Sequence, residues 1–209
     1  MKPLGLVGSP KARYSTSAHL LGMLKKHLKE PPIQPDVLCR HAPLEAAVFD
    51  QVLTADCLVL SFPLYVDGIP GHLLRHLEHL TPYLAKRSTP LTVYALCNAG
   101  YYEGIQAEVA LECVSHWCKR ANIIYGGGIG IGAGTMLAFA KVPLFKNLRR
   151  HLNVAFETLA AAINNQTIVR DTFVAPNFPR FLYKIIGNRM WFKALSAHGL
   201  KKKALYRRP

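Results

Sequence analysis

The feature that most constrains the fold of this chain is a regular alternation between two kinds of apolar segment. Short apolar runs of strand length, beginning with residues 4–8, alternate with longer segments in which apolar residues recur at helical spacing. The run at 57–62 contains no alternation of polar and apolar residues, which is typical of a strand buried on both faces of a sheet. The pattern therefore predicts an α/β domain with helices on both faces of a parallel sheet.

The alternation also predicts how the strands are ordered. Five strands are expected at residues 4–8, 36–40, 57–62, 91–97 and from 123 onward, separated and followed by helices near residues 20–28, 44–53, 72–80, 104–120 and 148–163. With right-handed crossovers, such a chain usually adopts either of two doubly wound orders, of which we predict the flavodoxin-like five-stranded parallel sheet with the order 2-1-3-4-5. We expect this domain to span residues 1–171 and a basic, aromatic-rich C-terminal extension to span 172–209.

The excess of positive charge is concentrated in that extension. The chain has 26 Lys and Arg against 12 Asp and Glu, a net charge of +14, and its last acidic residue is Asp171. Lys and Arg interleaved with aromatic and aliphatic residues suit an amphipathic helix that lies on an anionic membrane surface. The same composition suits a helix packed against its own domain or a second subunit, and both interpretations stay open, whereas nucleic acid is the least favoured partner.

Cysteine and histidine usage favours neither disulfides nor a metal site. The five cysteines are an odd number without a CxxC pair, so we expect free thiols in a reducing compartment and a cytoplasmic protein, peripheral to the membrane if the extension binds lipid. His72, His76 and His79 are expected on a solvated helix face, and no metal is expected. The uncharged 20-residue stretch 121–140 contains six glycines, which favours a buried strand with a close-packing glycine run at the sheet edge over a transmembrane helix.

The loop after the first strand has the composition of a phosphate-binding loop. It carries the hydroxyls of Ser9, Ser15, Thr16 and Ser17 together with Lys11, and it leads into the start of a helix. Hydroxyls, a cation and the free N–H groups of a first helical turn all bind phosphate oxygens. The alternative is that Ser15 or Ser17 only caps the helix. The loop has neither the GxxxxGK[ST] nor the GxGxxG pattern, which disfavours nucleoside triphosphates and dinucleotides.

Two later loops combine glycines with flat or apolar side chains. In the predicted strand order, the loops after strands 1, 3 and 4 meet at the sheet edge where the winding reverses, which is where ligands bind in such folds. The loop after strand 3 offers Pro63, Leu64, Tyr65 and Val66, and the loop after strand 4 offers Asn98, Gly100, Tyr101 and Tyr102. Together the three loops predict a monophosphate cradle beside a slot for a planar ring.

Four segments in this order and spacing carry a family resemblance. GSPKARYSTS, FPLYVDGIPG, CNAGYYEG and WCKRANIIYGGGIGIGAG resemble segments of the flavodoxin-like NAD(P)H-dependent FMN reductases, a group that includes quinone reductases. The resemblance implies FMN with its phosphate on Ser9, Lys11, Ser15, Thr16 and Ser17, its ring against Pro63, Leu64, Tyr65 and Val66, and its other polar edge covered by Asn98, Gly100, Tyr101 and Tyr102. Lys11 replaces a common arginine and Val66 a common aromatic residue, so ring stacking is expected to depend on Tyr65 and Tyr102.

The function that the resemblance implies is an FMN-dependent NAD(P)H oxidoreductase. Its electron acceptor would be a small molecule, namely a quinone, a nitro or azo compound, or a flavin, and the resemblance implies a homodimer. Because the flavin itself is the reactive group in such enzymes, no catalytic side chain is expected. Two alternatives stay open: a flavodoxin-type electron carrier, a class that is typically acidic, and a peripheral membrane or nucleic-acid-binding protein that uses the fold as a scaffold.

Overall fold

The chain forms two compact units. The computed structural model describes residues 3–11, 15–29, 37–38, 46–139 and 147–201, so Cys39 and the basic residues from 202 onward lie outside the described residues. The first unit is Met1–Pro176 and the second is Asn177–Pro209. The boundary lies beyond the expected one at 171/172, because residues 172–174 form a strand of the first unit's sheet.

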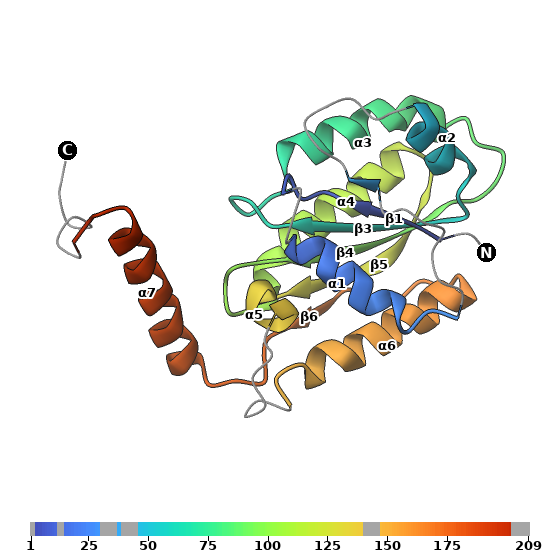
Figure 1. Ribbon diagram of the computed structural model, residues 1–209. Coiled ribbons are helices and arrows are strands. Elements are labelled where there is room, and N and C mark those ends of the chain that lie inside the picture. Colours follow the sequence, from blue (N-terminus) through green and yellow to red (C-terminus); the bar gives the residue numbers. More distant parts are fainter. Residues whose placement is uncertain (1–2, 12–14, 30–36, 39–45, 140–146, 202–209) are drawn as a thin grey trace. The chain divides into compact units, whose positions relative to one another are not determined.

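The first unit is built on a six-stranded parallel sheet (Figure 1). Its order is β2-β1-β3-β4-β5-β6, and every neighbouring pair is parallel. The strands are β1 Pro3–Val7, β2 Val37–Leu38, β3 Cys57–Pro63, β4 Thr92–Asn98, β5 Ile124–Ile131 and β6 Thr172–Val174. The predicted flavodoxin-like class, with its 2-1-3-4-5 order, is confirmed. The sixth strand was not expected, because three residues that include an exposed threonine carry no apolar run to predict it.

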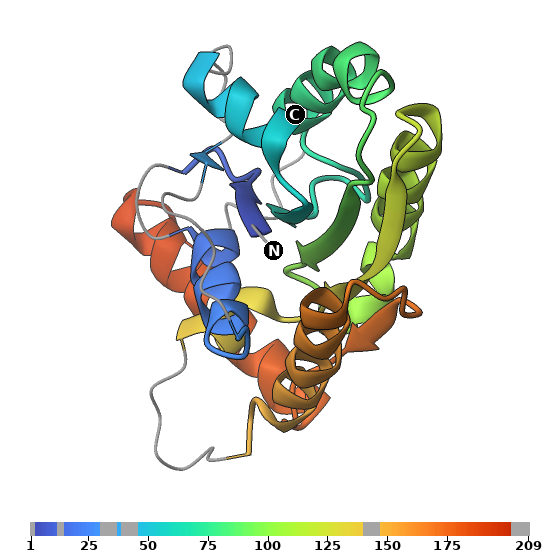
Figure 2. The ribbon, with the colours of Figure 1, turned by 90° about the vertical axis from the view of Figure 1, so that its right-hand side faces the viewer.

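Helices cover both faces of the sheet, as expected from the alternation. One layer contains α1 (Thr16–Lys25), α5 (Gly134–Phe139) and α6 (Arg150–Asn165), and the other contains α2 (Ala46–Thr54), α3 (Gly71–Leu84) and α4 (Glu108–Arg120), as Figures 1 and 2 show. The helix expected at 104–120 begins with a separate 3-10 turn, η1 (Gly104–Ala107). The short α5 was not expected, because it follows a glycine run and carries no helical repeat of its own.

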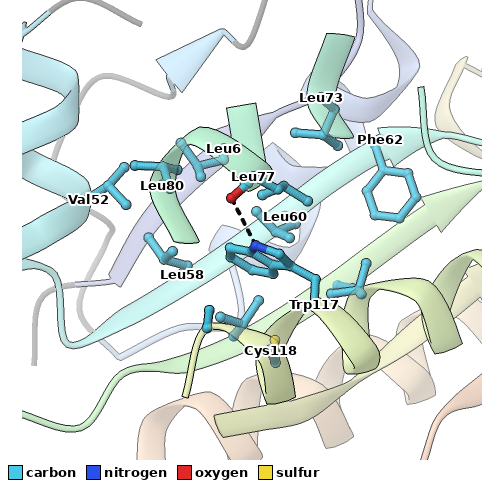
Figure 3. Packing of buried hydrophobic residues seen from close by; sticks show 14 of the residues in the cluster. Leu6, Val52, Leu58, Leu60, Phe62, Leu73, Leu77, Leu80, Trp117 and Cys118 are labelled. Atoms are coloured by element: carbon cyan, nitrogen blue, oxygen red, sulfur yellow. Dashed lines mark hydrogen bonds between the residues drawn. The ribbon is translucent and has the colours of Figure 1, made fainter. Parts of the chain in front are cut away.

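The core between the sheet and the α3 and α4 layer is continuous and apolar (Figure 3). Leu58, Leu60 and Phe62 on β3 are fully buried beneath these helices. The indole N–H of Trp117 on α4 donates to the carbonyl oxygen of Leu77 on α3 at 2.9 Å, so a buried polar group joins the two helices. This packing fixes the position of β3, at whose end the candidate site lies.

The glycine run on β5 allows close contacts with neighbouring backbone and side chains. A Cβ on Gly126 would lie 2.4 Å from the Tyr94 ring, and one on Gly132 would lie 2.1 Å from the carbonyl oxygen of Tyr102. The register shifts between Val93 and Tyr94, where Gly127 adopts a φ of 113° that favours glycine. The expected close-packing role therefore holds, but β5 is not the edge strand, because β6 covers it.

The histidines of α3 differ from the expectation. His72 and His76 are buried, and only His79 is exposed, so the prediction of one solvated face was wrong for two of the three. The reason is local packing: the Nε2 atom of His72 lies 3.1 Å from the carbonyl oxygen of Gly8, which gives a buried polar group a partner. Among the described residues, no group of three or more metal-binding side chains lies together.

The cysteines that the structure describes are free thiols. Cys57, Cys97 and Cys118 are buried, whereas Cys113 is exposed. Burial disfavours the thiolate and raises the pKa of both Cys57 and Cys118 to about 12. These two thiols are therefore protonated at neutral pH and take no part in surface chemistry.

The second unit contains the helix α7 (Arg180–Ala197). None of the residues in this helix is buried, although it carries many large apolar side chains. Throughout the described ranges, no helix is both long enough and apolar enough to span a bilayer.

Candidate functional site

The carboxyl ends of β1, β3 and β4 lie side by side and bring the three predicted loops together. In the register of the sheet, Val7 pairs with Ser61 and Pro63 pairs with Asn98. Backbone hydrogen bonds of 2.8 Å continue beyond the strands, from the Gly8 N–H to the Ser61 oxygen and from the Leu64 N–H to the Asn98 oxygen. The loops are therefore neighbours at the edge where the winding reverses, as the strand order predicts.

These loops enclose a hollow of about 170 Å³, which we call the strand-end pocket. It is lined by hydroxyl, amide, apolar and glycine residues from the three loops and by one threonine of α5: Ser9, Lys11, Thr16, Ser17, Pro63, Leu64, Tyr65, Asn98, Ala99, Gly100 and Thr135. Nine of the 13 residues predicted from the sequence line it. The remaining four, Ser15, Val66, Tyr101 and Tyr102, do not.

One wall of the pocket is the start of α1. Ser15 is the N-cap of this helix, and its Oγ accepts a hydrogen bond from the Ala18 N–H at 3.3 Å, so the capping interpretation describes what Ser15 does here. The first N–H groups of a helix have no partner within the helix, so those of Thr16 and Ser17 are donors for an anion. The Ser9 hydroxyl accepts from the Lys11 N–H at 3.4 Å and holds the preceding turn.

A buried hydrogen-bond network joins that wall to the ends of β3 and β4. The Asn98 amide nitrogen donates to Ser17 Oγ at 2.8 Å and to the Phe62 oxygen at 2.9 Å. The Ser61 hydroxyl donates to the Ser17 carbonyl oxygen at 2.8 Å. Asn98 is only 7% exposed, and its Oδ1 accepts no hydrogen bond from the residues that the structure describes. A buried acceptor without a partner is costly, so this oxygen needs a donor from a bound molecule or from water.

The second loop makes a tight turn beside the pocket. Tyr65 and Gly68 exchange two backbone hydrogen bonds of 3.1 Å, and the residues between them, Val66 and Asp67, have φ angles of 48° and 59°. Two positive φ angles define a type I′ turn, a conformation that a β-branched residue rarely adopts. Val66 is 100% exposed at the tip of this turn and outside the pocket. Of the residues predicted to face a ring, Pro63, Leu64 and Tyr65 are those the structure brings to the pocket.

The third loop contributes Gly100 to the strand-end pocket, but neither Tyr101 nor Tyr102 lines it. A Cβ added to Gly100 would meet no atom within 4 Å, so this side of the pocket is open. Tyr101 is exposed outside the pocket, and the Tyr102 hydroxyl donates to the Pro176 carbonyl oxygen at 3.2 Å. Of the two tyrosines on which ring stacking was expected to depend, the structure therefore brings Tyr65, and not Tyr102, to the strand-end pocket.

Sequence reasoning missed two residues of the pocket, Ala99 and Thr135. The segment before α5 is fixed to the third loop by a 2.9 Å hydrogen bond from the Gly134 N–H to the Ala99 oxygen. A Cβ on Gly134 would lie 2.8 Å from the Asn98 Cβ, so a glycine is needed for this approach. The available signal was a threonine directly after the glycine run, but the run was expected to pack at the sheet edge and not to lead into a helix beside the pocket.

A larger hollow of about 630 Å³ lies along α6 and β6. Half of its lining residues are polar and half are apolar: Arg150, His151, Thr158 and Thr172, and Val154, Ala155, Phe173 and Val174. It lies at the edge of the sheet and not at the carboxyl ends of strands 1, 3 and 4, and none of the predicted loops reaches it. The strand-end pocket is therefore the candidate site.

Comparisons by sequence give no relative for this chain. No protein-family model matches it, and no curated protein matches it either.

Comparison with solved structures does give relatives in fold. An NADH:FMN oxidoreductase in its apo form aligns with a TM-score of 0.59 at 15% identity and covers 79% of this chain and 89% of its own. A flavone reductase aligns with a TM-score of 0.59 at 12% identity and covers 81% of this chain and 66% of its own. An NADPH-quinone reductase from P. pentosaceus aligns with a TM-score of 0.51 at 17% identity and covers 77% of this chain and 98% of its own.

At these identities the likeness establishes the fold. The first unit has the flavodoxin-like architecture that these reductases share, and the resemblance predicted from the four sequence motifs is confirmed at the level of fold.

Proposed function

We propose that this protein is an FMN-dependent NAD(P)H oxidoreductase that reduces small acceptors, namely a quinone, a nitro or azo compound, or a flavin. The observation that carries the proposal is the strand-end pocket, which combines phosphate donors with an apolar wall at the edge where ligands bind in doubly wound folds. The names of three structural relatives, which include an NADH:FMN oxidoreductase and an NADPH-quinone reductase, support the same class.

The residues present fit the phosphate of FMN. The Ser9 and Thr16 hydroxyls, the Lys11 ammonium group and the first N–H groups of α1 would hold it at the β1–α1 end of the pocket. Ser17 would support the phosphate site indirectly, because its Oγ already accepts a hydrogen bond from the Asn98 amide nitrogen. Ser15 would keep the helix start in place through its cap.

The residues present also fit one edge and one face of the flavin ring. Pro63, Leu64 and Tyr65 would form the apolar wall, and Gly100 would leave room for the ring on the opposite side. The Asn98 Oδ1 would accept from a ring N–H and so gain the partner that it lacks among the described residues. When bound, FMN supplies the two-electron redox chemistry. The side chains bind and orient it, and we assign none of them a catalytic role.

Purified full-length protein tests the proposal directly. We expect a flavin absorbance spectrum, or uptake of added FMN, followed by bleaching of that spectrum when NADPH or NADH is added without oxygen. Reoxidation by a quinone, a nitro or azo compound, or free flavin then identifies the acceptor. Protein that is folded by circular dichroism but binds no FMN would refute the proposal, and bleaching that requires a second protein would favour an electron carrier.

We also propose that the protein is a cytoplasmic homodimer. The free, buried cysteines support a reducing compartment, and the family resemblance supports the dimer. Sedimentation of the purified protein at several concentrations would test the dimer, and fractionation of the source cells would test the location.

A further inference from the structure

The start of α5 forms one wall of the strand-end pocket. Thr135 is the second residue of this helix, and it lines the pocket. A helix of six residues is not stable by itself, because forming the first turn costs more conformational entropy than its few hydrogen bonds return. The position of Thr135 therefore depends on the contacts that hold the two ends of α5.

The N-terminal end of α5 is fixed to the third loop. The Gly134 N–H donates to the Ala99 carbonyl oxygen at 2.9 Å, and a Cβ added to Gly134 would lie 2.8 Å from the Asn98 Cβ. Further along the helix, Leu137 and Ala138 are buried, so one side of α5 packs into the first unit. The carbonyl groups at its C-terminal end still need donors, because the last carbonyls of a helix have no partner within it.

Arg149 caps that C-terminal end. Its Nε donates to the Leu137 carbonyl oxygen at 2.5 Å, and its Nη2 donates to the Ala138 carbonyl oxygen at 2.9 Å. One planar guanidinium group therefore bridges two successive carbonyls of α5. Its positive charge is also favourable there, because the C-terminal end of a helix carries a partial negative charge.

The charge of Arg149 does not serve its own helix. Arg149 is the N-cap of α6, and the N-terminal end of a helix carries a partial positive charge that disfavours a cation. Its backbone is nevertheless well held, since Leu148 and Leu152 on either side of it are buried. A helix of 16 residues thus provides the base from which Arg149 holds the much shorter α5.

Thr135 lies on the side of the pocket that we assign to phosphate. α5 packs beside α1 in the same helical layer (Figures 1 and 2), and the start of α1 contributes Thr16 and Ser17 to the same pocket. The apolar wall, in contrast, comes from the loop after β3. A threonine hydroxyl is a donor for a phosphate oxygen, like the hydroxyls of Ser9 and Thr16.

We propose that the Thr135 hydroxyl binds the phosphate of FMN and that Arg149 is the positioning residue that holds α5 for this contact. The inference rests on the proposed function, because it assigns a further donor to the same site. Arg149 does not line the pocket, so it acts through α5 and not on the ligand.

Variants of Thr135 test the phosphate contact. Thr135→Val keeps the shape of the side chain but removes the hydroxyl, so FMN should bind about tenfold more weakly, as is typical when a hydrogen bond to a charged group is lost. Riboflavin lacks the phosphate and should bind as before. Thr135→Ser retains the hydroxyl and should bind FMN normally. Thr158→Val removes an exposed helical hydroxyl outside the strand-end pocket and is the control.

Variants of Arg149 test whether it acts through Thr135. Arg149→Lys keeps the charge but has no planar group to bridge two carbonyls, so it should weaken FMN binding about fivefold. In the Thr135→Val background the same change should cost less than about twofold, because the contact that Arg149 positions is already lost. Arg150→Lys makes the same exchange at the neighbouring exposed residue and is the matched control.

Hydrogen exchange of the ligand-free protein tests the role of Arg149 without any flavin. The amides of residues 134–139 should exchange faster in Arg149→Lys than in Arg150→Lys, because α5 opens more often once its cap is lost. Riboflavin binding by each variant shows that the rest of the pocket is formed.

The two parts of the inference have different contradicting results. Equal losses of FMN and riboflavin affinity in Thr135→Val, or no loss of either, would overturn the phosphate contact. Additive losses in the double variant, or unchanged exchange in α5, would show that Arg149 does not position Thr135. Folded protein without any of these changes that binds no FMN would refute the proposed function and the phosphate contact with it, whereas the exchange measurement would still decide what Arg149 does at α5.

Discussion

At the scale of single residues, Lys11 is the cation among the described residues that line the strand-end pocket. We predict that Lys11→Gln weakens FMN binding by about five- to tenfold, because one charge-assisted contact to the phosphate is lost at an exposed position. Riboflavin lacks the phosphate, so its affinity should not change. Fluorescence titration with both ligands measures the difference, and Lys26→Gln, at the opposite end of α1, is the control. A similar loss for both ligands would contradict the placement of the phosphate.

Gly100 provides the complementary prediction. Its added Cβ would meet no protein atom, so Gly100→Ala should fold normally but place a methyl group in the space for the ring. We expect FMN and riboflavin to bind about tenfold more weakly, as is typical of overpacking a site. Gly22→Ala is the matched control, because that glycine also has no atom within 4 Å of an added Cβ but lies on α1. Unchanged titrations with Gly100→Ala would show that the ring lies elsewhere.

The sequence predicted the kinds of side chain that line the strand-end pocket better than it predicted the individual residues. The hydroxyls, Lys11 and Asn98 follow from the strand order, because loops after neighbouring parallel strands must meet. Val66 and Tyr102 could not be placed in this way. Val66 lies at the exposed tip of a tight turn, and the Tyr102 hydroxyl donates a hydrogen bond to the Pro176 carbonyl oxygen outside the pocket. Thr135 was missed because it arrives on an unexpected short helix.

At the scale of elements, the 3-10 turn η1 packs directly on β5 and β6 through Gly104. A Cβ there would lie 2.3 Å from the Gly130 oxygen and 2.5 Å from the Val174 oxygen, and backbone atoms cannot rotate away as side chains do. We predict that Gly104→Ala lowers the free energy of unfolding by about 2–3 kcal/mol. Denaturant unfolding measures it against Gly71→Ala, which has no atom within 4 Å of the added Cβ and should not be destabilised. Equal stability of the two variants would contradict this packing.

Long apolar or periodic elements were predictable, and short ones were not. β3 and β4 are nearly uninterrupted apolar runs of strand length, and α4 repeats apolar residues every four positions, so the type of each element was predictable. β6 and α5 contain three and six residues, too few to carry a period, and they form because longer neighbours hold them in place. The 3-10 turn η1 before α4 likewise depends on its contact with Gly130 and Val174 and not on its own sequence.

At the scale of the whole molecule, FMN should stabilise the protein against heat. A ligand that binds only the folded state adds about 2.7 kcal/mol at a hundredfold excess over its Kd. For a chain of this size we predict a rise in Tm of about 5 °C or more. Differential scanning fluorimetry with FMN, riboflavin and inorganic phosphate checks the prediction, and FMN should give the largest shift. The same Tm with and without FMN would contradict the proposed site.

The short edge strand β6 has a consequence for how copies of this protein meet. An exposed sheet edge invites strand addition from another chain, and natural proteins protect themselves by keeping such edges short. β6 offers only three residues, of which Thr172 is exposed, so a foreign strand would gain few backbone hydrogen bonds there. Extending the sheet across two molecules from this side is therefore disfavoured, which guards the fold against fibre formation and directs association to helices or loops.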